Sequence, residues 1–158
     1  THRLDSRRYT SGIHLVRDPF DAIESWFELN QRWNGTSEVP WEEFVLEKAQ
    51  DRKQHTAHWM DAPRPILRLR FEDLKADTEQ ALSEILMWLD EPHTSADVSN
   101  AVEKASLQQA RKKEASDYSD VFYRKGEVGS GEAKYSEDQR SKIRAELSTY
   151  LNMLGYEA

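Results

Sequence analysis

Residues 13–25, IHLVRDPFDAIES, constrain the fold of this chain more than any other segment. Four apolar or β-prone residues, Ile13 to Val16, precede Arg17, and Asp18-Pro19 then opens an amphipathic pattern. This order predicts a strand that runs directly into a helix. The helix N-terminus offers unpaired N–H groups and the positive end of the helix dipole, so the junction predicts an anion site. Arg17 adds a two-pronged donor there, and the Ser25 hydroxyl reaches back from the second turn.

A second basic cluster, Arg124-Lys125-Gly126, lies far along the chain. We interpret the two clusters as one phosphate pocket, in which Gly126 lets the backbone approach an oxygen and Arg124 binds bidentately. The alternative for the triplet is a solvated basic turn. For Arg17 and Ser25 the alternative is a salt-bridged arginine at a strand end and a serine that faces solvent.

The remaining pattern predicts mostly helices. Apolar spacing places Trp26 on the buried face of the first helix, whereas the polar stretch 50–58 is expected to be exposed. Glu72-Asp73 is expected to cap or brace a strand–helix junction. Residues 108–135 show no sustained period and predict a long loop over the site, mobile without ligand. The expected elements are helices at 19–33, 40–60 and 77–90, helices that begin near 95 and 137, and a second strand at 66–71.

Composition excludes several classes of protein. The chain has 158 residues, no Cys and a net charge of −7, which predicts one domain or part of one and argues against nonspecific nucleic-acid binding. Basic clusters on an acidic body fit a small anionic ligand better. No apolar run reaches membrane-spanning length, so a membrane is not indicated in this segment. His55 and His58 could share a metal, but no third ligand is indicated, and we expect surface histidines and no metal.

The ordered motifs VRDPxDAxxS, LRFEDL and YRKGxxG resemble the C-terminal portion of sulfotransferases that use 3′-phosphoadenosine 5′-phosphosulfate (PAPS) as sulfuryl donor. The resemblance extends over nearly the whole chain. It implies that a set of residues from both clusters holds the donor's 3′-phosphate, namely Arg17, Ser25, Arg124, Lys125 and Gly126. It also implies that Phe71 packs near the adenine, where the family usually has Tyr.

The same resemblance implies a catalytic residue and a fold. Thr1-His2 looks like the end of the family's Lys-Thr-His motif, which would make His2 the catalytic base. The implied fold is α/β, a sulfotransferase-like (P-loop NTPase-like) parallel sheet flanked by helices. The N-terminal strands and the 5′-phosphosulfate loop are expected to be missing, so residues 1–158 would form a single partial domain. The late loop has Gly131-Glu132 where the family commonly continues to Trp, which implies looser closure over the donor.

The implied function is transfer of a sulfuryl group from PAPS to a hydroxyl or amine, without a metal. Its partners would be PAPS and an unidentified acceptor, which could be a carbohydrate, a small alcohol or phenol, or a protein. The alternative is a noncatalytic remnant that binds an adenosine phosphate or a protein partner. A nucleotide kinase is disfavoured, because Glu132 follows Gly131 where a Walker-type loop requires Lys.

Overall fold

The computed structural model describes residues 10–34, 40–106 and 128–156, and its centre is a small parallel sheet. Strands β1 (Gly12–Val16) and β2 (Ile66–Arg70) pair in register from Gly12 opposite Ile66 to Val16 opposite Arg70. Parallel strands require a long crossover, which the first two helices provide. The helices are α1 (Pro19–Asn34), α2 (Trp41–Met60), α3 (Phe71–Ala76), α4 (Thr78–Trp88), α5 (Ser95–Lys104) and α8 (Glu137–Leu154), with a short 3-10 helix, η1 (Glu132–Lys134).

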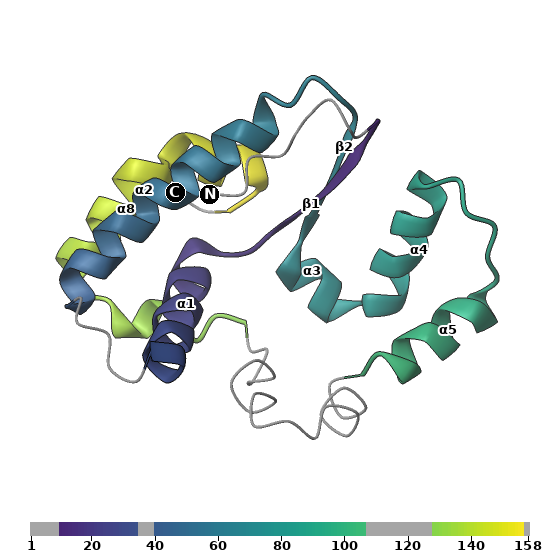
Figure 1. Ribbon diagram of the computed structural model, residues 1–158, viewed down its shortest axis with the longest axis horizontal. Coiled ribbons are helices and arrows are strands. Elements are labelled where there is room, and N and C mark those ends of the chain that lie inside the picture. Colours follow the sequence, from purple (N-terminus) through teal and green to yellow (C-terminus); the bar gives the residue numbers. More distant parts are fainter. Residues whose placement is uncertain (1–9, 35–39, 107–127, 157–158) are drawn as a thin grey trace.

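The helices lie in two groups on either side of the strands (Figure 1). Helices α2 and α8 run side by side, with α1 next to them, whereas α3, α4 and α5 lie beyond the sheet. The expected α/β architecture, a parallel sheet flanked by helices, is confirmed for the described residues. Each helix among them is too short or too polar to span a membrane.

The main core lies where α1, α2 and α8 meet. Trp26 was expected to be buried, but it is 41% exposed, and the Lys48 ammonium lies 4.6 Å from the centre of its ring. Helix α1 instead buries Asp21 and Glu24, which are 1% and 5% exposed. The core residues are Val16, Phe20, Ile23, Phe44, Val45, Ala49, Tyr135, Ile143, Leu147, Leu151 and Tyr156.

Local signals set most helix ends as predicted. Asp77, Thr94 and Ser136 each accept a hydrogen bond from a backbone N–H in the first turn of α4, α5 and α8. Gly155 ends α8 in the left-handed conformation, with φ of 77°. The expected strand at 66–71 is one residue shorter, because the chain already turns into α3 at Phe71.

His14 forms an aromatic cluster between β1 and α2. Its side chain is buried, stacks on Trp59 with ring centres 4.8 Å apart, and meets His55 edge to face at 5.5 Å. Burial, with smaller effects from His55, Arg68 and Arg52, lowers the pKa of His14 to about 4. No group of three potential metal ligands occurs among the described residues.

This cluster predicts that stability falls in mild acid. The unfolded chain takes up a proton at His14 near pH 6.5, whereas the folded chain resists until about pH 4. The stabilisation is therefore present above pH 6.5 and is lost as the pH falls toward 4, by about 1–3 kcal/mol. Urea unfolding at several pH values should show this slope in the wild type, and His14→Phe should flatten it. An equal slope in both proteins would contradict the prediction.

Candidate anion-binding site

The site begins at the junction of β1 and α1, where Asp18 caps the helix. Its carboxylate oxygen Oδ1 accepts hydrogen bonds from the N–H groups of Phe20 at 2.9 Å and Asp21 at 3.1 Å. Burial raises the pKa of the Asp18 carboxyl. We expected these N–H groups to be unpaired and to face an anion, and that expectation is wrong because Asp18 occupies them. An anion at this junction must therefore be bound by side chains.

Glu72 braces the same junction, as expected from the sequence. Its Oε1 accepts the Asp18 N–H at 2.9 Å, and its Oε2 accepts the Tyr156 hydroxyl at 2.7 Å. One carboxylate thus ties the start of α1 to the start of α3 and to the end of the described chain. This brace fixes the backbone beside Arg17.

Arg17 lies between an aromatic ring and a carboxylate. Its guanidinium carbon lies 4.8 Å from the centre of the Phe71 ring, and its Nη2 lies 3.9 Å from Asp21 Oδ2. Stacking on a ring restricts the arginine fork and still leaves its edge accessible. Phe71 therefore supports Arg17, and the contact with adenine that the sequence predicted for Phe71 remains a prediction.

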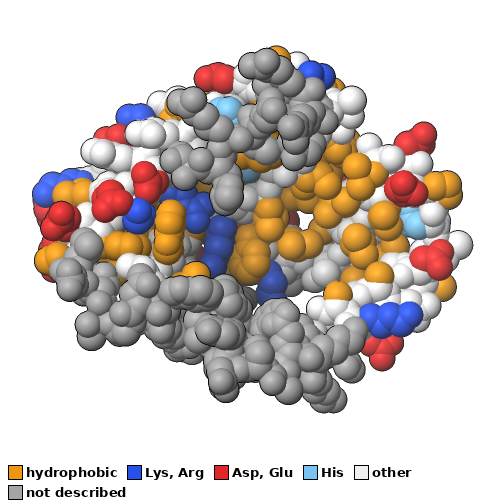
Figure 2. All heavy atoms as spheres, viewed as in Figure 1, with side chains coloured by type: hydrophobic (Ala, Val, Ile, Leu, Met, Phe, Trp, Pro, Cys, Tyr) orange, Lys and Arg blue, Asp and Glu red, His pale blue; other side chains and the backbone are white. Residues whose placement is uncertain are grey.

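Arg17 and Ser25 meet in one open hollow beside α1. The structure thus brings these two predicted residues together, and it adds Arg52 from α2 to the same hollow. The complete lining is Arg17, Ala22, Ser25, Trp26, Leu29 and Arg52. In the space-filling view, Lys and Arg side chains gather in the middle of one face, beside hydrophobic ones (Figure 2). The hollow offers cationic and hydroxyl donors, which is the donor set that a phosphate requires.

Arg52 was missed by the sequence analysis because residues 50–58 were interpreted as an exposed stretch. The helical spacing of Arg52 relative to apolar positions of α2 could have identified it. Position 52 shares a face of α2 with Val45, Ala49 and Thr56, all of which are buried. Burial, together with the charge of Arg17, lowers the pKa of Arg52.

A late segment is bonded to α1 next to this hollow. The Asp21 carboxylate accepts the N–H groups of Gly129 at 2.6 Å and Gly131 at 2.7 Å. The Tyr135 hydroxyl donates to the Phe20 carbonyl at 2.8 Å. Lys134 pairs with Glu24 and with Glu28 on the same helix. Residues 128–135 are thereby held against α1.

The last part of the long loop expected at 108–135 differs from that expectation. Its last part contains η1 and is anchored by several hydrogen bonds to α1. Gly131-Glu132 departs from the sulfotransferase pattern described above. Residues 128–135 are nevertheless bonded to α1 beside the site. Two sets of predicted site residues, His2 and the Arg124-Lys125-Gly126 cluster, lie outside the described residues.

A parallel strand that runs into a helix, with Arg17 and Ser25 at or near the junction and Arg52 contributed by α2, defines an α/β protein with a candidate anion site. The model of the sulfotransferase domain family matches residues 7–151, and the chain belongs to this family. No match was found among curated proteins.

Solved structures support the same fold. The structure of mouse sulfotransferase SULT7A1 complexed with PAP matches with a TM-score of 0.75 and 19% identity, over 89% of this chain and 58% of the other. Retinol dehydratase in complex with retinol and PAP matches with a TM-score of 0.59 and 16% identity, over 92% of this chain and 49% of the other. This chain therefore spans about half the length of these two proteins.

Gly131 offers a test of the anchored segment. A Cβ at this position would lie 2.7 Å from the Phe20 carbonyl oxygen and 2.8 Å from the Asp21 nitrogen. Gly131→Ala should push the segment off α1 and break the bond to Asp21, at a cost of about 1–3 kcal/mol of stability. Chemical denaturation would measure the loss, with the exposed Ser130→Ala as control. Equal stability of the two variants would show that the close packing at Gly131 is not required.

Proposed function

We propose that this chain carries the donor-binding part of a PAPS-dependent sulfotransferase, which transfers a sulfuryl group to a hydroxyl or amine. The observation that carries the proposal is the meeting of Arg17 and Ser25 in one hollow, in a chain of the sulfotransferase domain family. The structures with this fold named above contain PAP, the desulfated form of the donor. We propose the same nucleotide for this chain and place its 158 residues in one domain.

In this proposal the residues divide into an anchoring set and a reacting set. Arg17 and Ser25 bind the 3′-phosphate, Arg124, Lys125 and Gly126 close over it, and Phe71 lies toward the adenine. None of these groups touches sulfur. They hold the nucleotide at its far end, so that the donor lies in line with the acceptor.

PAPS supplies an activated sulfuryl group. His2 takes the proton of the acceptor as the new bond to sulfur forms and the bond between sulfur and the 5′-phosphate oxygen breaks. The electron pair of the broken bond leaves with the nucleotide, as in phosphoryl transfer. None of the roles that we assign to these residues requires a metal.

The alternative function, a noncatalytic module that binds an adenosine phosphate or a protein partner, keeps the phosphate site and lacks turnover. A transfer assay with radiolabelled PAPS and a panel of phenols, sugars and peptides on the full-length protein separates the two. Labelled product supports the enzyme. PAP binding without product from any acceptor favours the module.

Arg17→Ala should weaken PAP binding to the full-length protein by about 2–4 kcal/mol, because a desolvated phosphate loses a charged, bidentate partner. Titration calorimetry would measure the loss. Lys142→Ala is a matched control, since it removes one cation from an exposed ion pair with Asp138 on α8. Affinity equal to that of the control would remove Arg17 from the site.

His2→Ala should lower turnover by about 10²–10⁴-fold and leave PAP affinity nearly unchanged, because the base acts on the acceptor proton and not on the distant phosphate. The variant should also lose the acidic limb of the pH–rate profile, which a histidine of ordinary pKa near 6.5 creates. Steady-state kinetics over a range of pH would test both effects. Near-normal turnover would assign the proton to another residue.

A further inference from the structure

We propose that Arg52 of α2 is a further ligand of the donor's 3′-phosphate, which it would bind together with Arg17 and Ser25. The inference rests on the proposed function, because it takes PAP as the ligand. Neither the motifs in the sequence nor the resemblance to sulfotransferases assigned a role to this residue.

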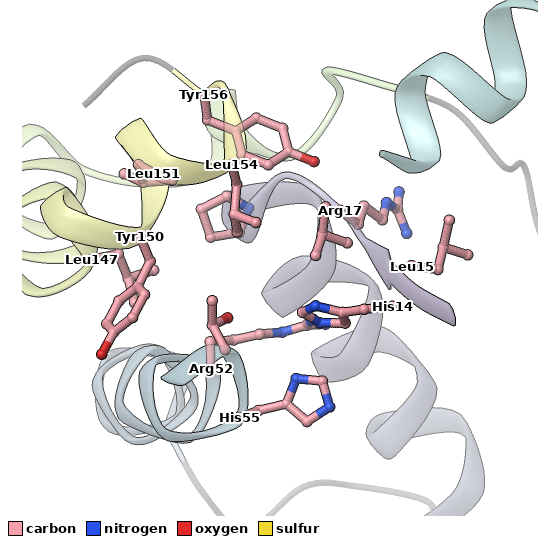
Figure 3. A pocket seen from close by; sticks show the side chains of 13 residues that line it. His14, Leu15, Arg17, Arg52, His55, Leu147, Tyr150, Leu151, Leu154 and Tyr156 are labelled. Atoms are coloured by element: carbon pink, nitrogen blue, oxygen red, sulfur yellow. The ribbon is translucent and has the colours of Figure 1, made fainter. Parts of the chain in front are cut away.

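Arg52 lines the same hollows as Arg17. Arg17 and Arg52 line the open hollow with Ser25, and the same two arginines line a second hollow between β1, α2 and α8. They are the only residues that the linings of these two hollows share. Figure 3 shows Arg52 reaching from α2 into the second hollow, while Arg17 directly follows the end of β1. The two guanidinium groups thus belong to one site built from different elements.

The surroundings of Arg52 do not balance its positive charge. The described residues place no carboxylate at ion-pair distance from Arg52, and its Nε is buried without a hydrogen-bond partner. Arg52 also lies close enough to Arg17 for the two cations to repel each other. A buried donor without an acceptor and a like-charge contact both cost free energy. A phosphate dianion placed between the two would relieve both costs.

The backbone of Arg52 is held rigidly by the packing of α2. Arg52 lies on the face of α2 whose neighbours Ala49 and Thr56 are buried, and α2 packs along α8. Its backbone position is therefore fixed before a ligand arrives. A preorganised arginine loses less entropy on binding than one carried by a free loop.

The decisive experiment compares two nucleotides on the full-length protein. PAP carries the 3′-phosphate and 5′-AMP lacks it. Calorimetry should show that Arg52→Ala binds PAP about ten- to a hundredfold more weakly and binds 5′-AMP like the wild type. Lys53→Ala is the matched control, because it removes the neighbouring cation of α2, which pairs with Glu146 of α8. The control should bind both nucleotides normally.

A second readout separates ligand binding from a packing role. Arg52→Met keeps the aliphatic stem and removes the charge of this half-buried side chain, so it should melt at the same temperature as the free wild type or about 2–4 °C above it. It should also gain less thermal stabilisation from PAP than the wild type does. A residue needed only for packing would lower the melting temperature instead.

The outcomes are distinct. Normal PAP binding by Arg52→Ala, when the wild type also binds PAP, overturns the inference and leaves the proposed function intact. Equal weakening of PAP and 5′-AMP, or loss of folding in both Arg52 variants, assigns Arg52 to packing and overturns it as well. Absence of PAP binding by the wild type overturns the donor assignment, and the role of Arg52 with it.

Discussion

The buried carboxylate of Asp21 is the interaction on which the site depends. It is 1% exposed, and it accepts two backbone N–H groups from a segment that follows it by more than a hundred positions. Charge-assisted bonds of this kind are roughly twice as strong as neutral ones. Removing the carboxylate would leave the buried Gly131 N–H without an acceptor, so the cost would exceed that of the bonds alone. Asp21 thereby holds the late segment beside Arg17 and Ser25.

The same carboxylate shapes the electrostatics of the junction. Asp21 lies 3.9 Å from Arg17 Nη2, yet its two oxygens already accept the glycine N–H groups. Asp18 likewise uses its carboxylate oxygen on the first turn of α1. Both of these carboxylates therefore accept backbone N–H groups. On a chain of net charge −7, this arrangement supports the anion site that we propose beside Arg17.

Structural features that depend on contacts between neighbouring residues could be predicted from the sequence. The β1–α1 junction and the caps at Asp77, Thr94 and Ser136 rest on contacts within a few residues, so periodicity and capping patterns identify them. The exposure of Trp26 could not be predicted in this way. Hydrophobicity favoured burying the indole, but the segment at 128–135 recruits Asp21 and Glu24 to the inner face of α1. A long-range contact of this kind leaves no trace in the local pattern.

Arg52 is a different case, because its signal was present and was outweighed by polarity. Long charged side chains are usually at the surface, so an arginine on an apolar helical face suggests a stem that packs and a head that reaches water. In this fold the head reaches an open hollow that also contains Arg17. The Nε of this half-buried arginine is buried without a hydrogen-bond partner, which reduces stability unless a ligand accepts from it. The polar stretch of α2 therefore contains the residue for which we propose a role in binding.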